Sequence, residues 1–319
     1  MISEKVILGI DTSNYTTSVA IVDVNGNIIA NLKRPLQVHE GERGLRQSDA
    51  LFLHTVNIPS LMQEAREILN GNIPVAIGVS RRPRNVDGSY MPCFLAGASA
   101  AESASAVSGV SLYSFSHQCG HIMAAVLSSG EESILDGEFA AFHISGGTTE
   151  LVKVKAVDSG FETALFGGTA DINAGQIIDR IGVMMGLRFP AGPHLEELAL
   201  ENKKKIPKRS VSANGMRVNL SGLENMATKL YRETDDKALV SAFVLDFIGR
   251  SIIAMSEAYE KEFGKTKFVY AGGVMCNSII RKMLSERFDA VFAHPSLSSD
   301  NAVGVAELAR RAFLKEGKC

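Results

Sequence analysis

The sequence lacks the features that mark several common classes of protein. It has no tryptophan, and its four cysteines are scattered without a CxxC spacing, so neither a disulfide framework nor a zinc ribbon is indicated. Neither a Ser/His/Asp triad nor an HExxH pattern can be argued from it. With 33 basic and 35 acidic residues, the formal net charge of −2 gives no overall attraction to nucleic acid or membranes. Any such binding must come from local patches.

Signals for export or for membrane insertion are also missing from the pattern. The first residues enter an apolar run at once, without a signal-peptide pattern, and no apolar stretch reaches the length needed to span a bilayer. We therefore expect a cytoplasmic protein with no membrane partner. The 319 residues, 45% hydrophobic and 21% charged, are enough to bury two cores.

Two distant stretches of the chain, residues 6–22 and 140–154, share one design. Each has an apolar run, a turn of Gly, Ser and Thr, and a second β-rich run, which is typical of a hairpin. Asp11 and Ser145 stand at equivalent points, where the first strand ends. Such a turn offers backbone N–H groups and hydroxyls that suit the oxygens of a phosphate. The recurrence predicts two facing lobes that hold a nucleotide between them.

The remaining chain alternates between helical and extended patterns, which predicts α/β lobes with helices packed on sheets. No low-complexity linker divides it, so we expect the lobes to meet along a broad interface. Helices are expected at 47–69, 94–108, from about 117, 172–185, 237–263, 277–287 and 301–315; strands at 75–79, 110–115, 267–270 and 290–293; a polar loop at 80–88, a Gly/Pro turn at 186–193 and a basic connection at 202–217.

His117 and His121 are the sharpest local signal. Side chains at i and i+4 of a helix lie on one face, about 6 Å apart, so the two imidazoles could bind one metal ion; an accidental pair is the alternative. Asp300 is a candidate third ligand, because it follows an expected strand and loops at strand ends are where such sites collect. It could equally cap the last helix. Two histidines and a carboxylate fit iron or zinc without choosing between them.

A double-glycine turn at Gly272 and Gly273 follows an expected strand. It would let a flat ring or a sugar approach the backbone, with Asn277 as a hydrogen-bond partner, or it is a plain tight turn. The Pro-rich loop before it along the chain contains Gly192, which is also suited to backbone approach.

Asp179 lies in the helix that precedes this Pro-rich loop, where it could face the cleft. Alternatively, it pairs with Arg180 or Arg188.

The segment 203–209 is strongly basic. Such a run is usually a solvated loop, but contact with the phosphates of RNA is the functional alternative, as it is for the loop that contains Arg81, Arg82 and Arg84. Cys119, between the two histidines, is more typical of a packing residue than of a nucleophile. The basic side chains of the run are Lys203, Lys204, Lys205, Lys208 and Arg209.

Together these motifs resemble, over nearly the whole chain and in the same order, the tRNA threonylcarbamoyladenosine synthase family, called TsaD in bacteria and once labelled glycoprotease. No single motif is specific, but the set is. It comprises Gly-Ile-Asp-Thr-Ser at 9–13, His-x-x-Gly-His at 117–121, Ser-Gly-Gly at 145–147, Phe-Pro-Ala-Gly-Pro at 189–193, Asn-Leu-Ser-Gly-Leu at 219–223, Ala-Gly-Gly-Val-x-x-Asn at 271–277 and Asp-Asn at 300–301.

The resemblance implies the two-lobed actin-like ATPase fold of sugar kinases and heat-shock chaperones, with a central nucleotide cleft. We expect the N-terminal lobe to comprise residues 1–112, completed by about 299–319, and the C-terminal lobe to comprise 113–298. The implied activity is metal-dependent transfer of a threonylcarbamoyl group from threonylcarbamoyl-AMP to the adenine next to the tRNA anticodon. The implied partners are tRNA and other tRNA-modification proteins, and a dimer stays open.

The resemblance also implies roles for individual residues. The metal ligands would be His117, His121 and Asp300. The adenylate would be held by the turn at 144–148, which contains Ser145, Gly146, Gly147 and Thr148, together with Asp179, Gly192 and Asn277.

The chain departs from the family pattern around the expected cleft. The stretch Asn14-Tyr15-Thr16-Thr17 stands where the family usually has Cys-Asp-Glu-Thr, so two carboxylates are missing. Cys119 replaces a Glu, Thr148 replaces a His, and Arg81–Arg84 replaces a Gly-Pro-Gly loop. Two alternative functions are therefore kept. One is a non-catalytic nucleotide-binding partner of a true synthase, and the other is a carbamoyltransferase with a small-molecule acceptor.

Overall fold

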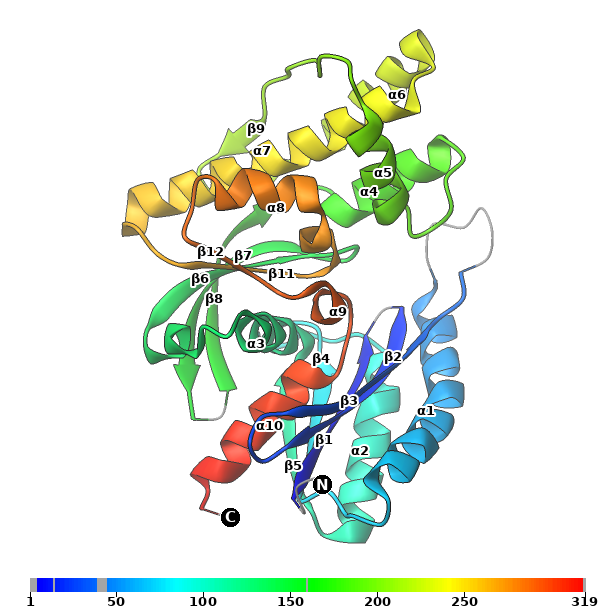
Figure 1. Ribbon diagram of the computed structural model, residues 1–319, viewed down its shortest axis with the longest axis vertical. Helices are drawn as coiled ribbons and strands as arrows, with labels where there is room; N and C mark the ends of the chain where they lie inside the picture. Colours follow the sequence, from blue (N-terminus) through cyan, green and yellow to red (C-terminus); the bar gives the residue numbers. More distant parts are fainter. Residues whose placement is uncertain (1–4, 14, 39–44, 159, 318–319) are drawn as a thin grey trace.

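The computed structural model (Figure 1) describes residues 5–13, 15–38, 45–158 and 160–317. Asn14 and Cys319 lie outside the described residues. Cys119 and Cys276 have free thiols.

A five-stranded sheet, in the order β3-β2-β1-β4-β5, is built around the first predicted hairpin. β1 and β2 pair antiparallel with Asp11 opposite Ser18, and β4 and β5 add in parallel. Every residue of β1 is buried, as expected for a central strand covered on both faces. The strands are β1 (Val6–Ser13), β2 (Thr16–Asp23), β3 (Ile28–Pro35), β4 (Ala76–Arg82) and β5 (Ser111–Ser116).

A seven-stranded sheet, in the order β12-β11-β6-β7-β8-β10-β9, contains the second predicted hairpin. β6 and β7 pair antiparallel, with Ile144 opposite Thr149 across the turn, which confirms that hairpin. The strands are β6 (Glu138–Ile144), β7 (Thr149–Val157), β8 (Gly160–Thr169), β9 (Ser212–Asn214), β10 (Arg217–Asn219), β11 (Phe268–Ala271) and β12 (Ala290–Phe292).

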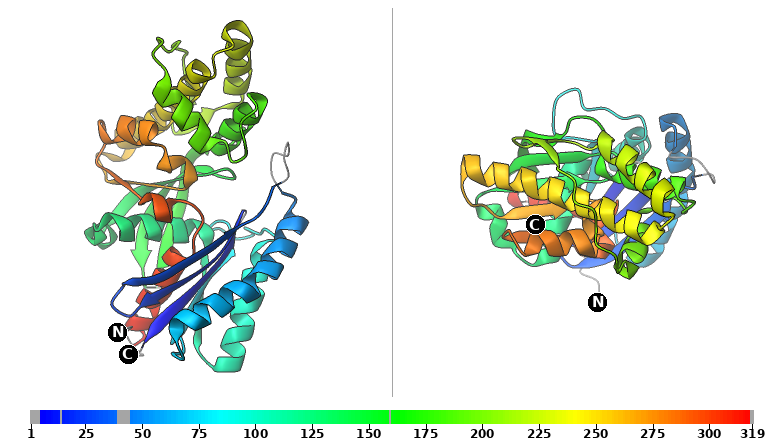
Figure 2. Two further views of the ribbon diagram at one scale, coloured as in Figure 1. Left: turned by 45° about the vertical axis from the view of Figure 1, so that its right-hand side comes forward. Right: turned by 90° about the horizontal axis from the view of Figure 1, so that it is seen from above.

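Helices and sheets alternate as layers (Figures 1 and 2). α7, α8, α5 and α4 lie on the outer side of the seven-stranded sheet, α3 and α10 lie between the two sheets, and α1 and α2 cover the outer face of the five-stranded sheet. The helices are α1 (Gln47–Leu69), α2 (Phe94–Ser108), α3 (His117–Ser129), α4 (Ala174–Met184), α5 (Gly192–Glu201), α6 (Ser221–Thr234), α7 (Lys237–Phe263), α8 (Ser278–Ser285), α9 (Pro295–Ser298) and α10 (Val303–Lys315), with short 3-10 helices η1 (Glu132–Asp136) and η2 (Gly273–Cys276).

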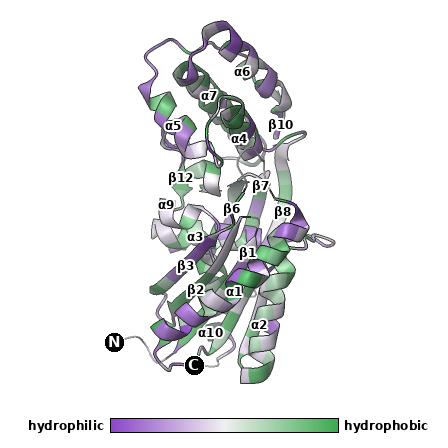
Figure 3. Ribbon diagram, turned by 90° about the vertical axis from the view of Figure 1, so that its right-hand side faces the viewer, coloured by the Kyte–Doolittle hydropathy of each residue, from purple (hydrophilic) through white to green (hydrophobic). Residues whose placement is uncertain are grey.

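α7 begins and ends at the predicted residues. Asp236 caps its first turn by accepting from the N–H of Leu239, and Gly264 follows its end. The expectation that no apolar stretch could span a bilayer is wrong by length and composition, because α7 passes both tests. However, 78% of its most apolar window is buried inside the fold, so it is a core helix (Figure 3).

α10 approaches its neighbours through glycines. A Cβ on Gly9 of β1 would lie 2.4 Å from the carbonyl oxygen of Ala302, and one on Gly78 of β4 would lie 2.3 Å from that of Val305. The closest approach is to α3, where a Cβ on Gly304 would lie 1.8 Å from the carbonyl oxygen of Gly120. These contacts leave room only for backbone, so α3 and α10 are held at a fixed separation.

The structure corrects three local predictions. β4 extends through Arg82, because its residues pair with β5 as far as Ser116, so Arg81 and Arg82 lie in a strand rather than a loop. The predicted Gly/Pro turn ends where α5 begins, at Gly192. The basic connection contains β9. The division into lobes at residues 112 and 113 stays a prediction, and β5 runs across that point.

Candidate metal centre and nucleotide cleft

The three predicted metal ligands meet at the junction of α3 and α10. His117 and His121 are one helical turn apart at the start of α3, with ring centroids 4.4 Å apart, and both are buried. Asp300 precedes α10, and its Oδ1 lies 3.3 Å from Nε2 of His121 and 3.5 Å from Nε2 of His117. The alternative that Asp300 caps the helix is wrong, because the cap position is Ala302 and Asn301 accepts from the N–H of Val303.

A third imidazole, which the sequence analysis missed, belongs to this cluster. His143 lies near the end of β6, and one ligand atom each from His117, His121 and His143 fall within 4.8 Å of one another. Nε2 of His143 and Nδ1 of His121 are buried and have no hydrogen-bond partner among the described residues. The only signal in the sequence was a histidine inside an apolar strand, where a ring without a partner is costly. Three nitrogens and one carboxylate oxygen match the ligands that zinc and iron take in proteins.

Asp11 contacts this cluster through a hydrogen bond to His117. Its Oδ2 accepts a 2.8 Å hydrogen bond from Nδ1 of His117 and another from the hydroxyl of Ser80, while Oδ1 accepts from the N–H of Ser13 at 2.9 Å. The side chain is fully buried. A carboxylate on Nδ1 fixes the tautomer of a histidine and leaves Nε2 for a metal ion. This position orients His117, whereas the expected contact of Asp11 with a nucleotide stays a prediction.

The charges in the cluster are tightly coupled. Burial alone would lower the pKa of His117, but the charges of Asp11 and Asp300 and its hydrogen bonds to them raise it to about 10. Burial and the positive charge of His117 lower the pKa of His121. Without a metal ion, His117 therefore carries the proton that balances the two carboxylates. A divalent cation would compete with that proton for the same site.

The turn between β6 and β7 faces the same cavity as the histidines. Ser145 N–H donates to the carbonyl of Thr148 at 2.8 Å, which closes the turn, and the N–H of Gly175 in α4 donates to the carbonyl of Ser145 at 3.3 Å. Gly146 and Gly147 form its tip. The cavity, of about 320 Å³, is lined by Ser145, Gly147 and Thr148 on one side, by His117 and His143, and by the loop at 83–91 on another side.

Asp179 holds the loop that leads to α5. Its Oδ1 accepts from the N–H of Ala191 at 2.8 Å, and burial raises the pKa of its carboxyl to about 6. The alternative that Asp179 pairs with Arg180 is wrong, because Arg180 pairs with Glu224 at 3.2 Å.

The other glycines and the asparagine predicted for the nucleotide have clear structural roles. Gly272 has φ of 96° and a Cβ there would lie 2.4 Å from the carbonyl oxygen of Ile144, so this turn packs against the end of β6. Gly273 begins η2, and Asn277 caps α8 by accepting from the N–H of Ile280 at 3.1 Å. Gly192 opens α5. Their contacts with a nucleotide stay predictions.

The basic run at 203–209 lies on the segment after α5, where all five of its cationic residues are exposed. Lys204 pairs with Asp236 at 2.7 Å, and the carbonyl of Arg209 accepts from Arg250 at 2.7 Å. The run is therefore a solvated segment in this structure, and its contact with RNA stays a prediction.

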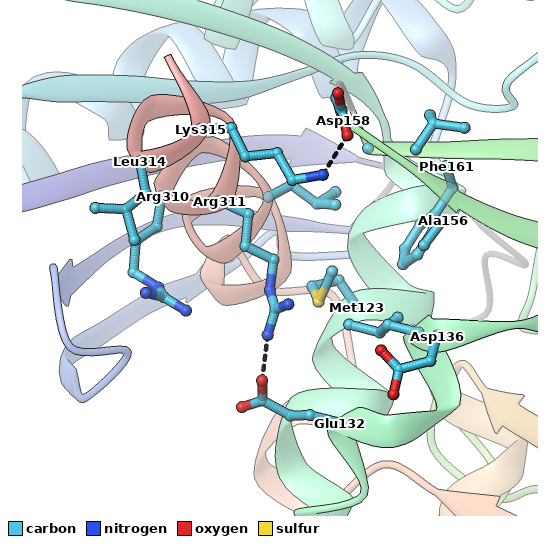
Figure 4. A pocket seen from close by; sticks show the side chains of 14 residues that line it. Met123, Glu132, Asp136, Ala156, Asp158, Phe161, Arg310, Arg311, Leu314 and Lys315 are labelled. Atoms are coloured by element: carbon cyan, nitrogen blue, oxygen red, sulfur yellow. Dashed lines mark hydrogen bonds and ion pairs between the residues drawn. The ribbon is translucent and has the colours of Figure 1, made fainter. Parts of the chain in front are cut away.

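A second hollow, of about 400 Å³, lies between α10, η1 and the β7–β8 hairpin (Figure 4). Its cationic side chains pair with carboxylates of the chain itself: Arg311 with Glu132, Lys315 with Asp158, and Arg310 with the buried Glu307. It contains none of the residues that the sequence marks for chemistry. The reactive groups of the described chain gather instead around the histidines.

Comparison with known proteins gives one consistent family. The family model described as tRNA N6-adenosine threonylcarbamoyltransferase matches residues 27–307. Proteins of that name from Sulfurihydrogenibium sp. (strain YO3AOP1) and Carboxydothermus hydrogenoformans are 28% and 29% identical, over 98% and 97% of this chain and 92% and 93% of their own lengths.

Solved structures share the fold at much lower identity. HypF of T. kodakarensis has a TM-score of 0.63 at 13% identity, over 98% of this chain and 48% of its own. A ROK family glucokinase from Streptomyces griseus, in complex with glucose and AMPPNP, has a TM-score of 0.52 at 14% identity, over 96% and 99%. These similarities confirm the predicted actin-like ATPase fold.

Proposed function

The chain belongs to the tRNA N6-adenosine threonylcarbamoyltransferase family, and we propose that it transfers a threonylcarbamoyl group from threonylcarbamoyl-AMP to the adenine beside the tRNA anticodon. One observation carries the proposal. The Ser145–Thr148 turn and two histidines of the cluster, His117 and His143, line a single cavity, although they come from separate parts of the chain. An anion-binding turn beside a set of metal ligands is what an adenylated acyl donor requires.

The reaction needs no protein nucleophile, in keeping with the lack of a recognisable triad. The exocyclic amine of adenine attacks the carbonyl carbon of the donor and forms the new C–N bond. The C–O bond to the phosphate breaks, AMP leaves with its electron pair, and the amine releases one proton to solvent. Orientation of the two substrates and stabilisation of the oxyanion are the tasks left to the protein.

Residues of the chain divide these tasks. Backbone N–H groups of the turn and the hydroxyls of Ser145 and Thr148 would bind the phosphate of the donor. The loop held by Asp179 would close over the adenosine, and Gly273, where a Cβ would meet nothing within 4 Å, would let the nucleotide approach the backbone.

A divalent metal, iron or zinc, would be held by His117, His121 and Asp300, and we add His143 as a ligand. The unpartnered ring nitrogens of His121 and His143 support this fit, as does the Asp11 carboxylate on His117. Bound there, the metal would supply Lewis-acid stabilisation of charge on the substrate oxygens. We expect about one metal ion per chain.

The test is transfer from threonylcarbamoyl-AMP to unmodified tRNA, with wild type and His117→Ala side by side and metal content measured on both. Modified tRNA should form with wild type only, and the variant should lose its metal. His194→Ala is the matched control, because His194 is half exposed on α5, outside the cluster. Full metal content in His117→Ala would contradict the ligand assignment.

The same assay separates the alternative functions if it is run with and without the other tRNA-modification proteins of the host, which we propose as partners. Metal and donor bound without transfer to tRNA would favour a small-molecule acceptor or a non-catalytic role.

For the tRNA itself, we propose contact through the exposed basic run at 203–209. Neutralising Lys203, Lys205 and Lys208, which form no ion pair with any described residue, should weaken tRNA binding and flatten its dependence on salt. An unchanged salt slope would remove this run from the interface.

A further inference from the structure

The cavity at the histidine cluster has one arginine and no acidic side chain among its described lining residues. Arg84 lines it, together with Pro83, Met91 and Phe94 from the same part of the chain. A cavity of about 320 Å³ has the volume of roughly ten water molecules. A phosphate on the Ser145–Thr148 turn and a plain carbamoyl group would together leave part of that space unfilled. The site has room for a larger acyl group that carries a negative charge.

Among the described residues, the side chain of Arg84 is held in place through only one of its nitrogens. Its Nε lies 2.8 Å from Oε1 of Glu150, and Oε2 of Glu150 accepts from Nε2 of Gln118 at 2.8 Å. Glu150 is 7% exposed, whereas the side chain of Arg84 is 47% exposed. The two terminal nitrogens of Arg84 have no hydrogen-bond partner among the described residues. They are the pair of donors that binds a carboxylate in a fork.

The backbone of the Arg84 loop is also fixed. The carbonyl of Pro83 accepts from the N–H of Gln118 at 3.0 Å, and the N–H of Arg84 donates to the hydroxyl of Ser89 at 3.0 Å. Across the interface between the sheets, the side-chain amide of Asn85 donates to the carbonyl of Phe161 at 2.7 Å. A residue positioned before its ligand arrives loses little conformational entropy on binding.

We propose that Arg84 binds the free carboxylate of the amino acid in the acyl group of the donor, and thereby selects donors whose carbamoyl nitrogen carries an amino acid over plain carbamoyl donors. This inference rests on the proposed function. The Ser145–Thr148 turn already offers donors for the phosphate of AMP, so the arginine is available for the second anion. The apolar surfaces of Met91 and Phe94 beside it would contact the aliphatic part of the amino acid.

The test measures binding of three non-transferable analogues of the donor, in which a methylene replaces the scissile oxygen, by calorimetry on the full chain. One carries the threonine carboxylate, the second its carboxamide, and the third a plain carbamoyl group. Wild type should bind the carboxylate analogue at least tenfold more tightly than the carboxamide. Arg84→Ala should bind these two with affinities within threefold of each other, and Arg84→Lys should keep part of the preference.

Two further variants separate a specific role from a general one. Arg81→Ala is the control, because Arg81 pairs with Glu102 outside the cavity, and it should keep the full preference. Glu150→Gln should reduce the preference for the carboxylate while its melting temperature stays near that of wild type, because it loosens the anchor of Arg84.

The outcomes are distinct. The inference is wrong if wild type shows no preference for the carboxylate analogue, or if Arg84→Ala lowers the affinity for all three analogues equally. In either case Arg84 does not bind the carboxylate. Equal weakening would assign Arg84 to the phosphate. These results would leave the proposed function standing, because they concern only the second anion. If none of the analogues binds to wild type, the protein does not use an adenylated acyl donor. Both the proposed function and this inference would then be wrong.

Discussion

Among single residues, Asp179 and Asp171 show how the surroundings set the charge of a carboxyl group. Asp179 is partly buried and has one donor, the N–H of Ala191, so burial raises its pKa to about 6. Burial acts in the same direction on Asp171, but the donors from Ser221, Leu220 and Ile172 outweigh it and lower its pKa. Ionisation of Asp179 therefore destabilises the folded state, whereas ionisation of Asp171 stabilises it.

Asp179→Asn should make the protein more stable at neutral pH. Between the ordinary pKa of 3.8 and about 6, the folded state holds a proton on Asp179 that the unfolded state has lost, so wild-type stability falls as pH rises through this window. The free energy of unfolding of the variant does not fall in this window. It should exceed that of wild type by an amount on the order of 2 kcal/mol above pH 6, and the difference should vanish near pH 4. Thermal unfolding as a function of pH measures it. Asp171→Asn, the control, should lose stability at neutral pH; gains in both variants would contradict the burial argument.

Local spacing was enough to predict His117, His121 and Asp300 as a group, because a helix fixes the first two and a strand end places the third. Local spacing could not predict that His143 joins this cluster or that Arg84 pairs with Glu150. These contacts join residues that are far apart in the chain, and they depend on how the two sheets face each other. Periodicity within one segment does not contain that information.

Among the elements, the contact of α3 with α10 positions the proposed metal ligands. Gly120 lies one residue before His121, and Gly304 lies one turn after Asp300, so the backbone contact between the glycines sets the distance from the histidines to the carboxylate. A side chain at this point would separate the helices and, with them, the ligands.

Gly304→Ala should lower the stability by about 2 kcal/mol and weaken metal binding, because its Cβ would lie 1.8 Å from the carbonyl oxygen of Gly120. Gly222→Ala is the matched control: it also lies in a helix, α6, but a Cβ there meets nothing within 4 Å. It should be neutral or stabilising, since alanine favours a helix. Urea unfolding and metal content measure both. Equal behaviour of the two variants would exclude the helix contact as the cause.

Elements were predictable where their pattern was strong. α7 was predicted to the residue because its long apolar run is bounded by a cap and a glycine. No prediction was made for β8 or α6. Three of the ten residues of β8 are exposed, in no regular alternation, and α6 buries only Leu223 and Ala227. Such segments are ordered by their neighbours, which a single pass along the sequence does not reveal.

On the scale of the whole molecule, the proposed metal ligands belong to different layers. His143 lies in the seven-stranded sheet, His117 and His121 lie on α3, and Asp300 lies beside the helix that packs on the five-stranded sheet. A metal ion bound to all of them would therefore connect the two sheets. Binding energy of this kind adds to the stability of the folded state.

Removal of the metal should lower the melting temperature of wild type, and restoring zinc or iron should raise it again. At a free metal concentration of 100 times Kd, the gain is about 2.7 kcal/mol. Calorimetry of chelated and reconstituted protein measures it. His143→Ala should lose most of the gain, while His194→Ala, on the surface of α5, should keep it. If metal raises the melting temperature of His143→Ala as much as that of wild type, His143 is not a metal ligand.

The packing of α10 on β1 also has a consequence for how the protein is made. β1 leaves the ribosome long before α10, the helix that covers it and lies beside Asp300. Until α10 has been made, the growing chain carries an uncovered face of the five-stranded sheet, which is the kind of surface that chaperones bind. The proposed metal site and the core of this sheet therefore form together, once α10 is available.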